Sequence, residues 1–246
     1  LLLAETAENA EAVAEYLCDV NKQRQTVENA IIDEAVEKLY EEQDLTKDKV
    51  IVLADDGWNH GVIGIVASRI TEKFSMPTIL VTFDSTDPLS ERSGQDIGKG
   101  SGRSIKGMNL VEALTHCSDL LVKYGGHELA AGLSIKRQDL PEFRRRINEY
   151  ARNIFTEGDS EIVLEADGVL APEDITMSLA AQSASIIEPC GTGNPTPAFI
   201  LMDATVTAIR AVGSGKHCKL SLEADGRYFN AMYFGISPAE LSCEKG

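Results

Sequence analysis

The chain has 246 residues, enough for one large or two ordinary domains, and its composition of 43% hydrophobic and 25% charged residues excludes an intrinsically disordered protein. A formal net charge of −16 argues against a basic coat for nucleic acid over the chain as a whole. The acidity is concentrated, however, because residues 1–49 hold 13 acidic and 5 basic residues, so the total charge says little about partners of the middle of the chain.

Cysteine usage and apolar patterning indicate a reduced, cytoplasmic protein. The five cysteines are scattered without a CxxC pair, and the four histidines show no metal-ligand spacing, so we expect no structural zinc. No apolar run approaches the length of a membrane span and no signal-peptide pattern opens the chain, so we expect no membrane partner. Because the sequence begins Leu1-Leu2-Leu3 rather than with methionine, we expect it to be a piece of a longer protein.

Residues 5–43 predict one long acidic helix, since apolar residues recur at three- and four-residue steps without Gly or Pro. We expect it to connect domains, and a plain bundle helix is the alternative. Beyond it, strands and helices alternate, which predicts an α/β domain with a mostly parallel sheet covered by helices. The expected elements are strands at 49–54, 77–83 and 129–135, helices at 62–74, 110–123 and 140–155, and a polar loop at 84–108.

Residues 156–160 form a polar break, after which β-type patterns dominate. We expect strands at 162–169, 198–209, 217–224 and 227–234 and a helix at 173–187, with Asp225-Gly226 as a hairpin turn. An OB-type barrel has about five strands. Because the pattern shows about four, we expect a smaller, β-rich OB-type domain whose last part is missing.

The segment Gly125-Gly126-His127-Glu128-Leu129-Ala130-Ala131-Gly132 has the composition of a phosphate-contacting loop. Glycine lets the backbone approach a ligand closely and adopt positive φ, and adjacent N–H groups form an anion-binding concavity. His127 adds a donor that can be charged near neutral pH. A tight turn with a structural histidine is an equally good interpretation of these residues taken alone.

The most basic ten-residue window is Gly98–Gly107, which holds three bases, four glycines and no acidic residue. Backbone amides with arginine and lysine donors suit phosphate, and a flexible surface loop is the alternative. The window is neither a P-loop nor a dinucleotide-binding fingerprint. The candidate phosphate-binding residues in it are Lys99, Gly102, Arg103, Ser104 and Lys106.

Other motifs carry weaker signals. Trp58 precedes a helix start in which we interpret Gly61 and Gly64 as packing residues rather than an anion site. Lys216 and Lys219 fall at an expected barrel strand, where they could line a single-strand groove, although a chance pair of lysines is the simpler interpretation. No carboxylate cluster, Ser-His-Asp set or Cys-His pair indicates a catalytic centre or a metal site.

Six motifs come in an order that resembles a known family. They are Asn21-x-x-Arg24-Gln25-x-x-Glu28, Trp58-Asn59-x-Gly61-Val62-Ile63-Gly64, Gly100-Ser101-Gly102-Arg103-Ser104, Gly125-Gly126-His127-x-x-Ala130-Ala131-Gly132, Gly193-Asn194-Pro195-x-Pro197-x-Phe199 and Gly215-Lys216-His217-x-Lys219-Leu220. Together they resemble the RecJ family of single-stranded-DNA-specific exonucleases in the DHH phosphoesterase superfamily, and the resemblance covers nearly the whole chain.

The resemblance implies the C-terminal part of a 5′-to-3′ exonuclease of DNA repair and recombination. Its parts would be a connecting helix at 1–48, a DHH-associated α/β domain at 49–156 and an OB-type domain at 161–246. By this resemblance His127 and Arg103 contact DNA phosphate near the scissile bond, and Gly125 and Gly126 allow the close approach. His60 stands where relatives often carry proline, so no role is carried over to it.

The resemblance also implies where the metal chemistry lies. The family's DHH domain, which supplies aspartates and histidines for two Mn²⁺ (or Mg²⁺) ions, falls outside this sequence, so we expect no cofactor here and no activity of this chain alone. One alternative is a small-oligonucleotide or cyclic-dinucleotide phosphodiesterase, whose known relatives lack an OB-type domain. Another is a nucleic-acid-binding module of a parent with an inactive metal site. The resemblance implies single-stranded DNA as partner, and no particular single-strand-binding protein or helicase.

Overall fold

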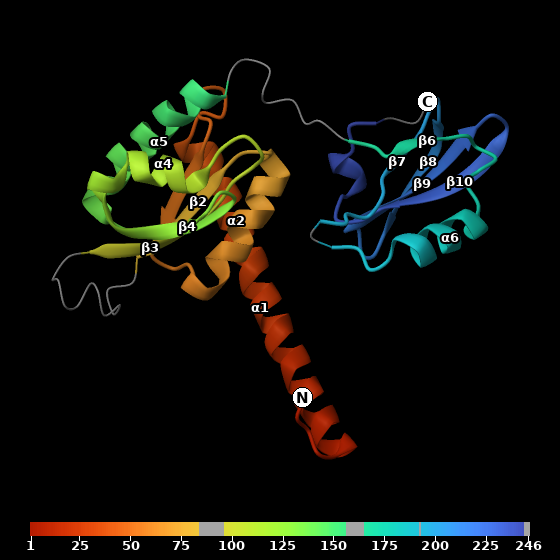
Figure 1. The fold of residues 1–246 in the computed structure, drawn as a ribbon, viewed down its shortest axis with the longest axis horizontal. Coiled ribbons are helices and arrows are strands. Elements are labelled where there is room, and N and C mark those ends of the chain that lie inside the picture. The colour runs from red at the N-terminus through yellow and green to blue at the C-terminus, as the bar shows by residue number, and fades with distance from the viewer. Residues whose placement is uncertain (84–95, 156–164, 192, 244–246) are drawn as a thin grey trace. The chain divides into compact units, whose positions relative to one another are not determined.

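The computed structural model describes residues 1–83, 96–155, 165–191 and 193–243. The chain divides into two compact units, residues 1–162 and residues 163–246. The first unit contains one five-stranded sheet with helices on both faces, and the second contains short strands and one longer helix (Figure 1).

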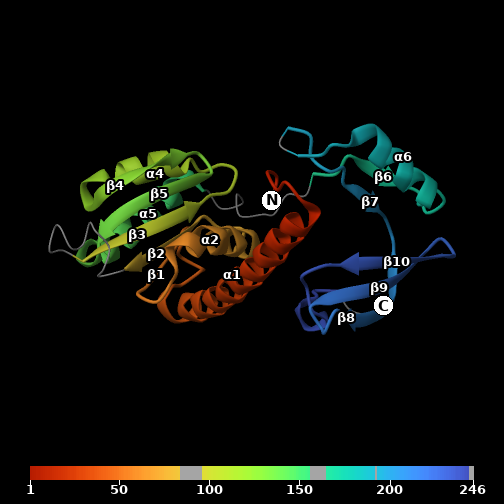
Figure 2. The same ribbon diagram turned by 90° about the horizontal axis from the view of Figure 1, so that it is seen from below.

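A long helix, α1, opens the first unit at Ala7–Glu42, which confirms the helix expected at 5–43. Its C-terminal half packs on α2 (His60–Phe74), whereas the apolar side chains of its N-terminal half are exposed. Figures 1 and 2 show this N-terminal half extending beyond the sheet of its own unit. The α1 residues buried against α2 and the sheet are Ile31, Ala35 and Leu39.

The sheet of the first unit has the strand order β1-β2-β3-β5-β4. Its strands are β1 (Ile51–Asp55), β2 (Thr78–Phe83), β3 (Ile97–Arg103), β4 (Leu121–His127) and β5 (Ala130–Lys136). The β1–β2 pair is parallel, and the pairs β2–β3, β3–β5 and β4–β5 are antiparallel. The α/β class is confirmed, but the sheet is mixed rather than mostly parallel.

Two strands that the sequence analysis did not expect account for the mixed sheet. β3 lies in the segment expected as a polar loop at 84–108, of which residues 84–95 fall outside the described part of the chain. β4 takes the place of the end of the helix expected at 110–123 and of the glycine-histidine loop, because α4 (Leu110–His116) ends early. A two-residue turn, Glu128-Leu129, joins β4 to β5, and so short a connection permits only antiparallel pairing.

The helices divide the sheet into a covered side and a partly open side. α4 and α5 (Leu140–Ile154) bury one face in a core that includes Val52, Val81 and Leu133. On the opposite face, α1 and α2 bury Leu53 and Leu80 of the β1–β2 half. Apart from Ser134, which is buried, the residues that β4 and β5 present on that opposite face are half-buried or exposed, so this half of the sheet is the more accessible one.

Side chains close the outer edge of β1. Asn148 of α5 accepts hydrogen bonds from the backbone N–H groups of Lys49 and Val50 at 2.7 and 2.9 Å, and donates to the Val50 carbonyl at 3.0 Å. Gln43, which follows α1, accepts from the Val52 N–H at 2.7 Å. Because buried backbone groups must be paired, these two amides replace a neighbouring strand.

The second unit is β-rich. An antiparallel sheet has the order β10-β9-β8, and β6 pairs in parallel with β7. The Asp225-Gly226 turn between β9 and β10 is confirmed, with both residues at positive φ. The elements are β6 (Gly168–Leu170), α6 (Met177–Ile187), β7 (Phe199–Leu201), β8 (Thr205–Val212), β9 (His217–Ala224) and β10 (Arg227–Tyr233). The strand expected at 198–209 is thus two strands, and residues 162–164 of the one expected at 162–169 lie outside the described residues.

Candidate functional site

Most of the basic, glycine-rich window forms strand β3, whose two faces lie in different surroundings. Gly98, Gly100 and Gly102 face the α4–α5 core, where a Cβ would come within 2.7 to 2.9 Å of a neighbouring side chain. A residue with a side chain at these positions would collide with Phe83, Leu133 or Leu110, respectively. Gly102, a candidate phosphate-binding residue, therefore has a packing task and faces away from the accessible side of the sheet.

The alternate residues of β3, namely Lys99, Ser101 and Arg103, lie on the accessible face, since successive residues of a strand point to opposite sides. Arg103 Nη1 donates to Ser101 Oγ at 3.1 Å and to the Gly102 carbonyl at 2.8 Å, which fixes the guanidinium beside the strand. A Cβ on Gly64 of α2 would lie 3.0 Å from Ser101 Oγ and 3.2 Å from Arg103 Nη2. The interpretation of Gly64 as a packing residue therefore agrees with this geometry, because it lets α2 lie close to these side chains.

The strand register sets the accessible residues of β3, β5 and β4 in three rows. Residues paired across antiparallel strands point to the same face, so each row runs across the three strands in the order β3, β5, β4. The rows are Lys99–Ser134–Lys123, Ser101–Gly132–Gly125 and Arg103–Ala130–His127. Cationic or ionisable side chains thus occupy the four corners, and small residues occupy the rest.

The centre of this face is bare backbone. A Cβ on Gly125 would meet no atom within 4 Å, and one on Gly132 would meet only the Gly100 carbonyl at 3.8 Å. Gly126 differs, since its φ is +152° and its Cβ would lie 2.4 Å from the Ala130 carbonyl oxygen. The fold therefore requires Gly126, whereas Gly125 leaves open space in which a ligand can approach the strands.

His127 is the last residue of β4 and its side chain is exposed. Among the described residues it makes no side-chain hydrogen bond, which favours a ligand-facing histidine over a structural one. Ser104 differs, because its Oγ donates to the Met108 carbonyl at 2.8 Å and its N–H to the Leu129 carbonyl at 2.9 Å. Ser104 thereby ties the segment after β3 to the β4–β5 turn, and Lys106 is exposed in that segment.

A hollow of ≈ 310 Å³ adjoins the Lys99–Ser134–Lys123 row and reaches His60, the first residue of α2. Gly125 and Gly132 contribute to its floor. None of the described residues that line it is acidic, although the chain as a whole is strongly acidic. The sequence analysis did not single out Lys123 or Ser134. Each is four residues from His127 or Ala130 along its strand, and a step of two residues along a strand keeps side chains on one face.

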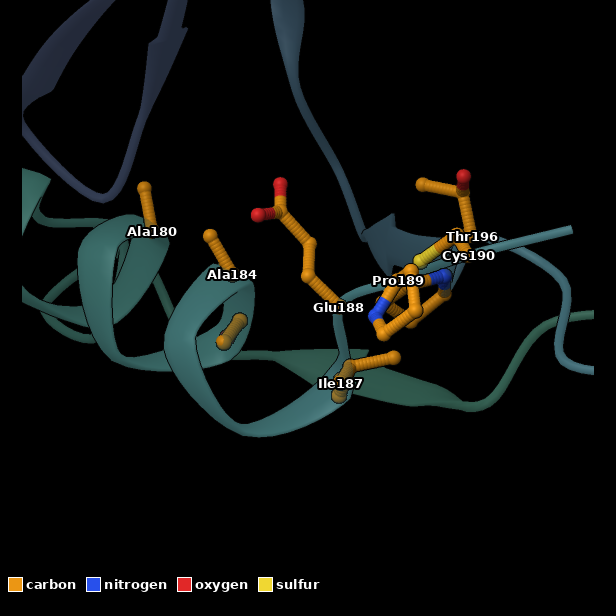
Figure 3. A pocket seen from close by; sticks show the side chains of 9 residues that line it. Ala180, Ala184, Ile187, Glu188, Pro189, Cys190 and Thr196 are labelled. Carbon is orange, nitrogen blue, oxygen red and sulfur yellow. The ribbon is translucent and has the colours of Figure 1, made fainter.

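A larger hollow of ≈ 730 Å³ lies in the second unit, between the C-terminal end of α6 and the segment that follows it (Figure 3). Glu188 is the charged side chain in its lining, next to Pro189, Cys190 and the alanines of α6. Because none of the described residues that line this hollow is basic, its carboxylate does not suit an anionic ligand. The chemistry of phosphate binding therefore selects the smaller hollow of the first unit.

The candidates Lys216 and Lys219 belong to the second unit. Lys219 lies in the middle strand β9, between Arg210 of β8 and Met232 of β10 in the same row. Lys216 is in the turn before β9, and its N–H donates to the Gly213 carbonyl at 3.2 Å. Arg210, which the sequence analysis missed, adds a second base to this row.

Within the described ranges, no group of three or more His, Cys, Asp and Glu side chains could hold a metal ion. The described residues therefore do not form the site that a divalent metal would need. Among the helices in the described part of the chain, none combines the length and apolarity needed to cross a membrane.

Comparison with known proteins gives consistent matches. Residues 47–153 match the DHHA1 domain family, and residues 166–246 match the RecJ OB domain family. The chain is 38% identical over 242 residues to the single-stranded-DNA-specific exonuclease RecJ of Bacillus subtilis, and 36% identical over 223 residues to that of Thermus thermophilus. These alignments cover 98% and 91% of this chain but 29% and 30% of the relatives, so the chain spans less than a third of their length.

Solved structures give the same result. The crystal structure of Thermus thermophilus RecJ in complex with Mn²⁺ superimposes with a TM-score of 0.70 at 34% identity, covering 94% of this chain and 32% of that one. The Mg²⁺ complex of the same protein gives a TM-score of 0.69 at 32% identity, with 95% and 33% covered.

Proposed function

We propose, since this chain belongs to the RecJ family and carries its DHHA1 and OB domains, that it is the nucleic-acid-binding C-terminal part of a single-stranded-DNA-specific 5′-to-3′ exonuclease. The parts would be a connecting helix at 1–48, an α/β domain at 49–156 and an OB-type domain at 161–246. The whole protein would act in DNA repair and recombination in the cytoplasm, with Mn²⁺ or Mg²⁺ held by residues outside this chain.

One observation carries the proposal: the row Arg103–Ala130–His127 beside bare Gly125 on an accessible sheet face. Guanidinium groups bind phosphate oxygens through paired N–H donors, and imidazole adds a further donor from the other side of the row. Ala130, between them, is too small to block a phosphate. A nucleic-acid strand could therefore place one phosphate between the two donors.

Arg103 and His127 would assist catalysis by electrostatics. Arg103 is held in place by Ser101, and β4 fixes the backbone of His127 at the other end of the row. Preorganised donors stabilise negative charge that develops on a phosphate in the transition state. The metal ions and the attacking water would come from the remainder of the whole protein, so this chain alone would bind DNA without cleaving it.

The presence of an OB domain argues against the small-oligonucleotide phosphodiesterase, because the relatives of that kind lack one. The other alternative, a nucleic-acid-binding module of a parent with an inactive metal site, requires the same geometry in this chain. Only the nuclease activity of the whole protein distinguishes it from the proposed function.

Binding of a labelled, 5′-phosphorylated single strand, followed by anisotropy at several salt concentrations, tests the proposal. With two or three phosphate contacts at roughly −0.7 each, the log–log slope should be about −2 to −3. Arg103→Gln should flatten the slope, whereas Lys22→Gln, which removes an exposed lysine of α1, should leave it unchanged. A preference for duplex, or a slope that Arg103→Gln does not alter, would contradict the proposal.

A further inference from the structure

Only the C-terminal half of α1 is attached to the rest of its unit. The buried residues of this helix are Glu28, Ile31, Ala35 and Leu39, so burial begins at Glu28. Residues 7–27, here called the arm, are exposed or half-buried, and Figure 2 shows them leaving the sheet. At 1.5 Å per residue the arm is about 30 Å long. Its direction therefore depends on the contacts of the half that follows it.

Glu28 lies where the arm begins, and two arginines share its carboxylate. Glu28 Oε2 accepts a hydrogen bond from Arg24 Nη1 of the same helix. Glu28 Oε1 forms an ion pair with Arg69 Nε of α2 at 3.6 Å. Asn21 holds Arg24 in turn, since its Oδ1 accepts from Arg24 Nε at 3.2 Å and from Nη2 at 3.0 Å. These contacts join the Asn21, Arg24 and Glu28 positions of one sequence motif, to which the proposed function gives no role.

The Glu28–Arg69 pair is the contact best placed to set the angle of the arm. Glu28 is only 7% exposed, and a buried carboxylate that loses its cation is strongly disfavoured. The pair therefore favours those orientations of α1 that keep Glu28 against α2, whereas apolar burial is non-directional. Further ion pairs attach α1 at Lys38 and Glu42, farther from the arm, so that attachment at both ends of this half defines the helix axis.

The length of the arm amplifies any change in that angle. A rotation of 10° at Glu28 would move the far end of the arm by about 5 Å. In the proposed function, α1 connects the Arg103–His127 row to the remainder of the whole protein, which carries out cleavage. Because a misplacement of 1 Å can lower a catalytic rate about 10²-fold, such a rotation would separate the phosphate site from the groups that act on it.

We propose that Glu28, through its pair with Arg69, is a positioning residue that fixes the direction of the arm. It thereby sets where the remainder of the whole protein lies against the Arg103–His127 row. The inference rests on the proposed function for this second part, because it takes α1 as the connection between the two. The first part, the fixed direction, concerns this chain alone.

The distance between two spin labels, measured by electron paramagnetic resonance, tests the direction of the arm in this chain. One label is placed on the arm at Glu11→Cys and the other on α5 at Asn153→Cys, both exposed positions. The exposed native cysteines are first changed to serine, at Cys18, Cys190 and Cys243. Glu28→Gln and Arg69→Gln should each shift or broaden the distance distribution by about 4 Å. The double variant should match the single ones, because all three remove the same contact.

A matched control comes from the second carboxylate beside Arg69. Glu72 Oε2 lies 3.5 Å from Arg69 Nη1, is exposed and belongs to α2 itself. Glu72→Gln therefore removes a charge from the same arginine without releasing α1, and the distance distribution should stay that of the wild type. If Glu28→Gln does not fold, Arg69→Gln gives the same test, because the Arg69 side chain is 60% exposed.

Single-turnover cleavage by the whole protein tests the second part. Glu28→Gln and Arg69→Gln should lower it by about 10²-fold at saturating DNA, while the salt slope of DNA binding to this chain stays unchanged. Asn148→Ala, which weakens the attachment of α5 to β1 instead, controls for a general loss of stability. Assayed where it is folded, it should cleave at a rate near that of the wild type.

The outcomes separate the inference from the proposed function. A distance distribution that neither Glu28→Gln nor Arg69→Gln alters overturns the inference and leaves the proposed function standing, because phosphate binding does not involve these residues. An altered distribution with normal cleavage overturns the positioning role. A salt slope that Arg103→Gln does not alter overturns the proposed function, whatever the distance measurement gives.

Discussion

Arg103 and His127 flank Ala130 in one row of the sheet, although 24 positions separate them along the chain. Strand register alone brings them together, since each is paired with Ala130 from a different side. Neighbouring strands lie about 4.8 Å apart, so the backbones of Arg103 on β3 and His127 on β4 are two such distances apart, with β5 between them. This separation is about that of two donors that bind one phosphate from opposite sides. This relationship makes both residues testable as a pair.

Replacing either donor in the restored whole protein should impair turnover without harming the fold. We expect Arg103→Ala and His127→Ala each to lower single-turnover cleavage by about 10²–10³, as for other preorganised donors. The melting temperature should stay close to that of the wild type, because neither side chain belongs to the core. Near-normal cleavage by both folded variants would leave the phosphate site without support.

The two neighbouring glycines should respond differently to the same substitution. Gly126→Ala should destabilise the fold by about 1–3 kcal/mol, because its Cβ would lie 2.4 Å from the Ala130 carbonyl oxygen. Gly125→Ala should leave stability almost unchanged, and the larger Gly125→Val should weaken DNA binding by filling the bare row. Chemical denaturation and anisotropy on the same samples measure both effects. Equal destabilisation by both alanines would refute the distinction.

The chain by itself should neither bind Mn²⁺ tightly nor degrade DNA. The described residues contain no cluster of ligands for a metal ion. Calorimetric titration with Mn²⁺ and a gel assay on labelled single strands make the measurement. Metal-dependent digestion by the purified chain would show that the catalytic groups lie within it after all.

How far the sequence predicts this fold depends on the periodicity of each element. α1 was predictable because its apolar residues keep a helical repeat over 36 residues. β3 was missed because glycine is depleted in strands, and its alternation of glycine with Lys99, Ser101 and Arg103 resembles a flexible loop. That alternation is nevertheless the two-residue period of a strand with one packed face.

The site was predictable in composition and not in arrangement. Arg103 and His127 stood out through their glycine-rich surroundings, and both lie on the accessible face. Lys123 was hidden because an apolar helical pattern was extended through it, whereas β4 begins at Leu121. The register between β3, β5 and β4, which sets the rows, depends on packing across the sheet and has no signal in any one segment.

Asn148 should be essential for the attachment of α5 to β1. Asn148→Ala would leave the backbone N–H groups of Lys49 and Val50 without their acceptor, at roughly 1–3 kcal/mol for each unsatisfied group, whereas the Val50 carbonyl would keep its hydrogen bond from Gln43 Nε2. We expect a loss of at least about 2 kcal/mol in unfolding free energy by urea denaturation. The exposed Asn29→Ala in α1 is the control and should stay within about 0.5 kcal/mol of the wild type.

The cysteines should fall into two reactivity classes. Cys117 is buried, and burial raises the pKa of its thiol to about 11, so little thiolate exists at neutral pH. Cys218 is buried as well. In the native state we expect a thiol-specific reagent to modify Cys18, Cys190 and Cys243 rapidly, and the other two only after unfolding. Rapid labelling of Cys117 in the folded chain, located by mass spectrometry, would contradict this packing.

The alternation along β3 has a consequence for how this strand tolerates mutation. A Cβ at position 98, 100 or 102 would lie 2.7 to 2.9 Å from a core side chain, so any residue larger than glycine there must displace the core. The side chains at positions 99, 101 and 103 lie on the other face, outside the α4–α5 core, so substitutions that still fit beside α2 change what the face can hold. In a library that contains every substitution in this seven-residue strand, selection for protein abundance should therefore remove variants at positions 98, 100 and 102. Selection for DNA binding should remove variants at positions 99, 101 and 103 as well. The effects of mutation on folding and on DNA binding could thus be measured separately within one strand.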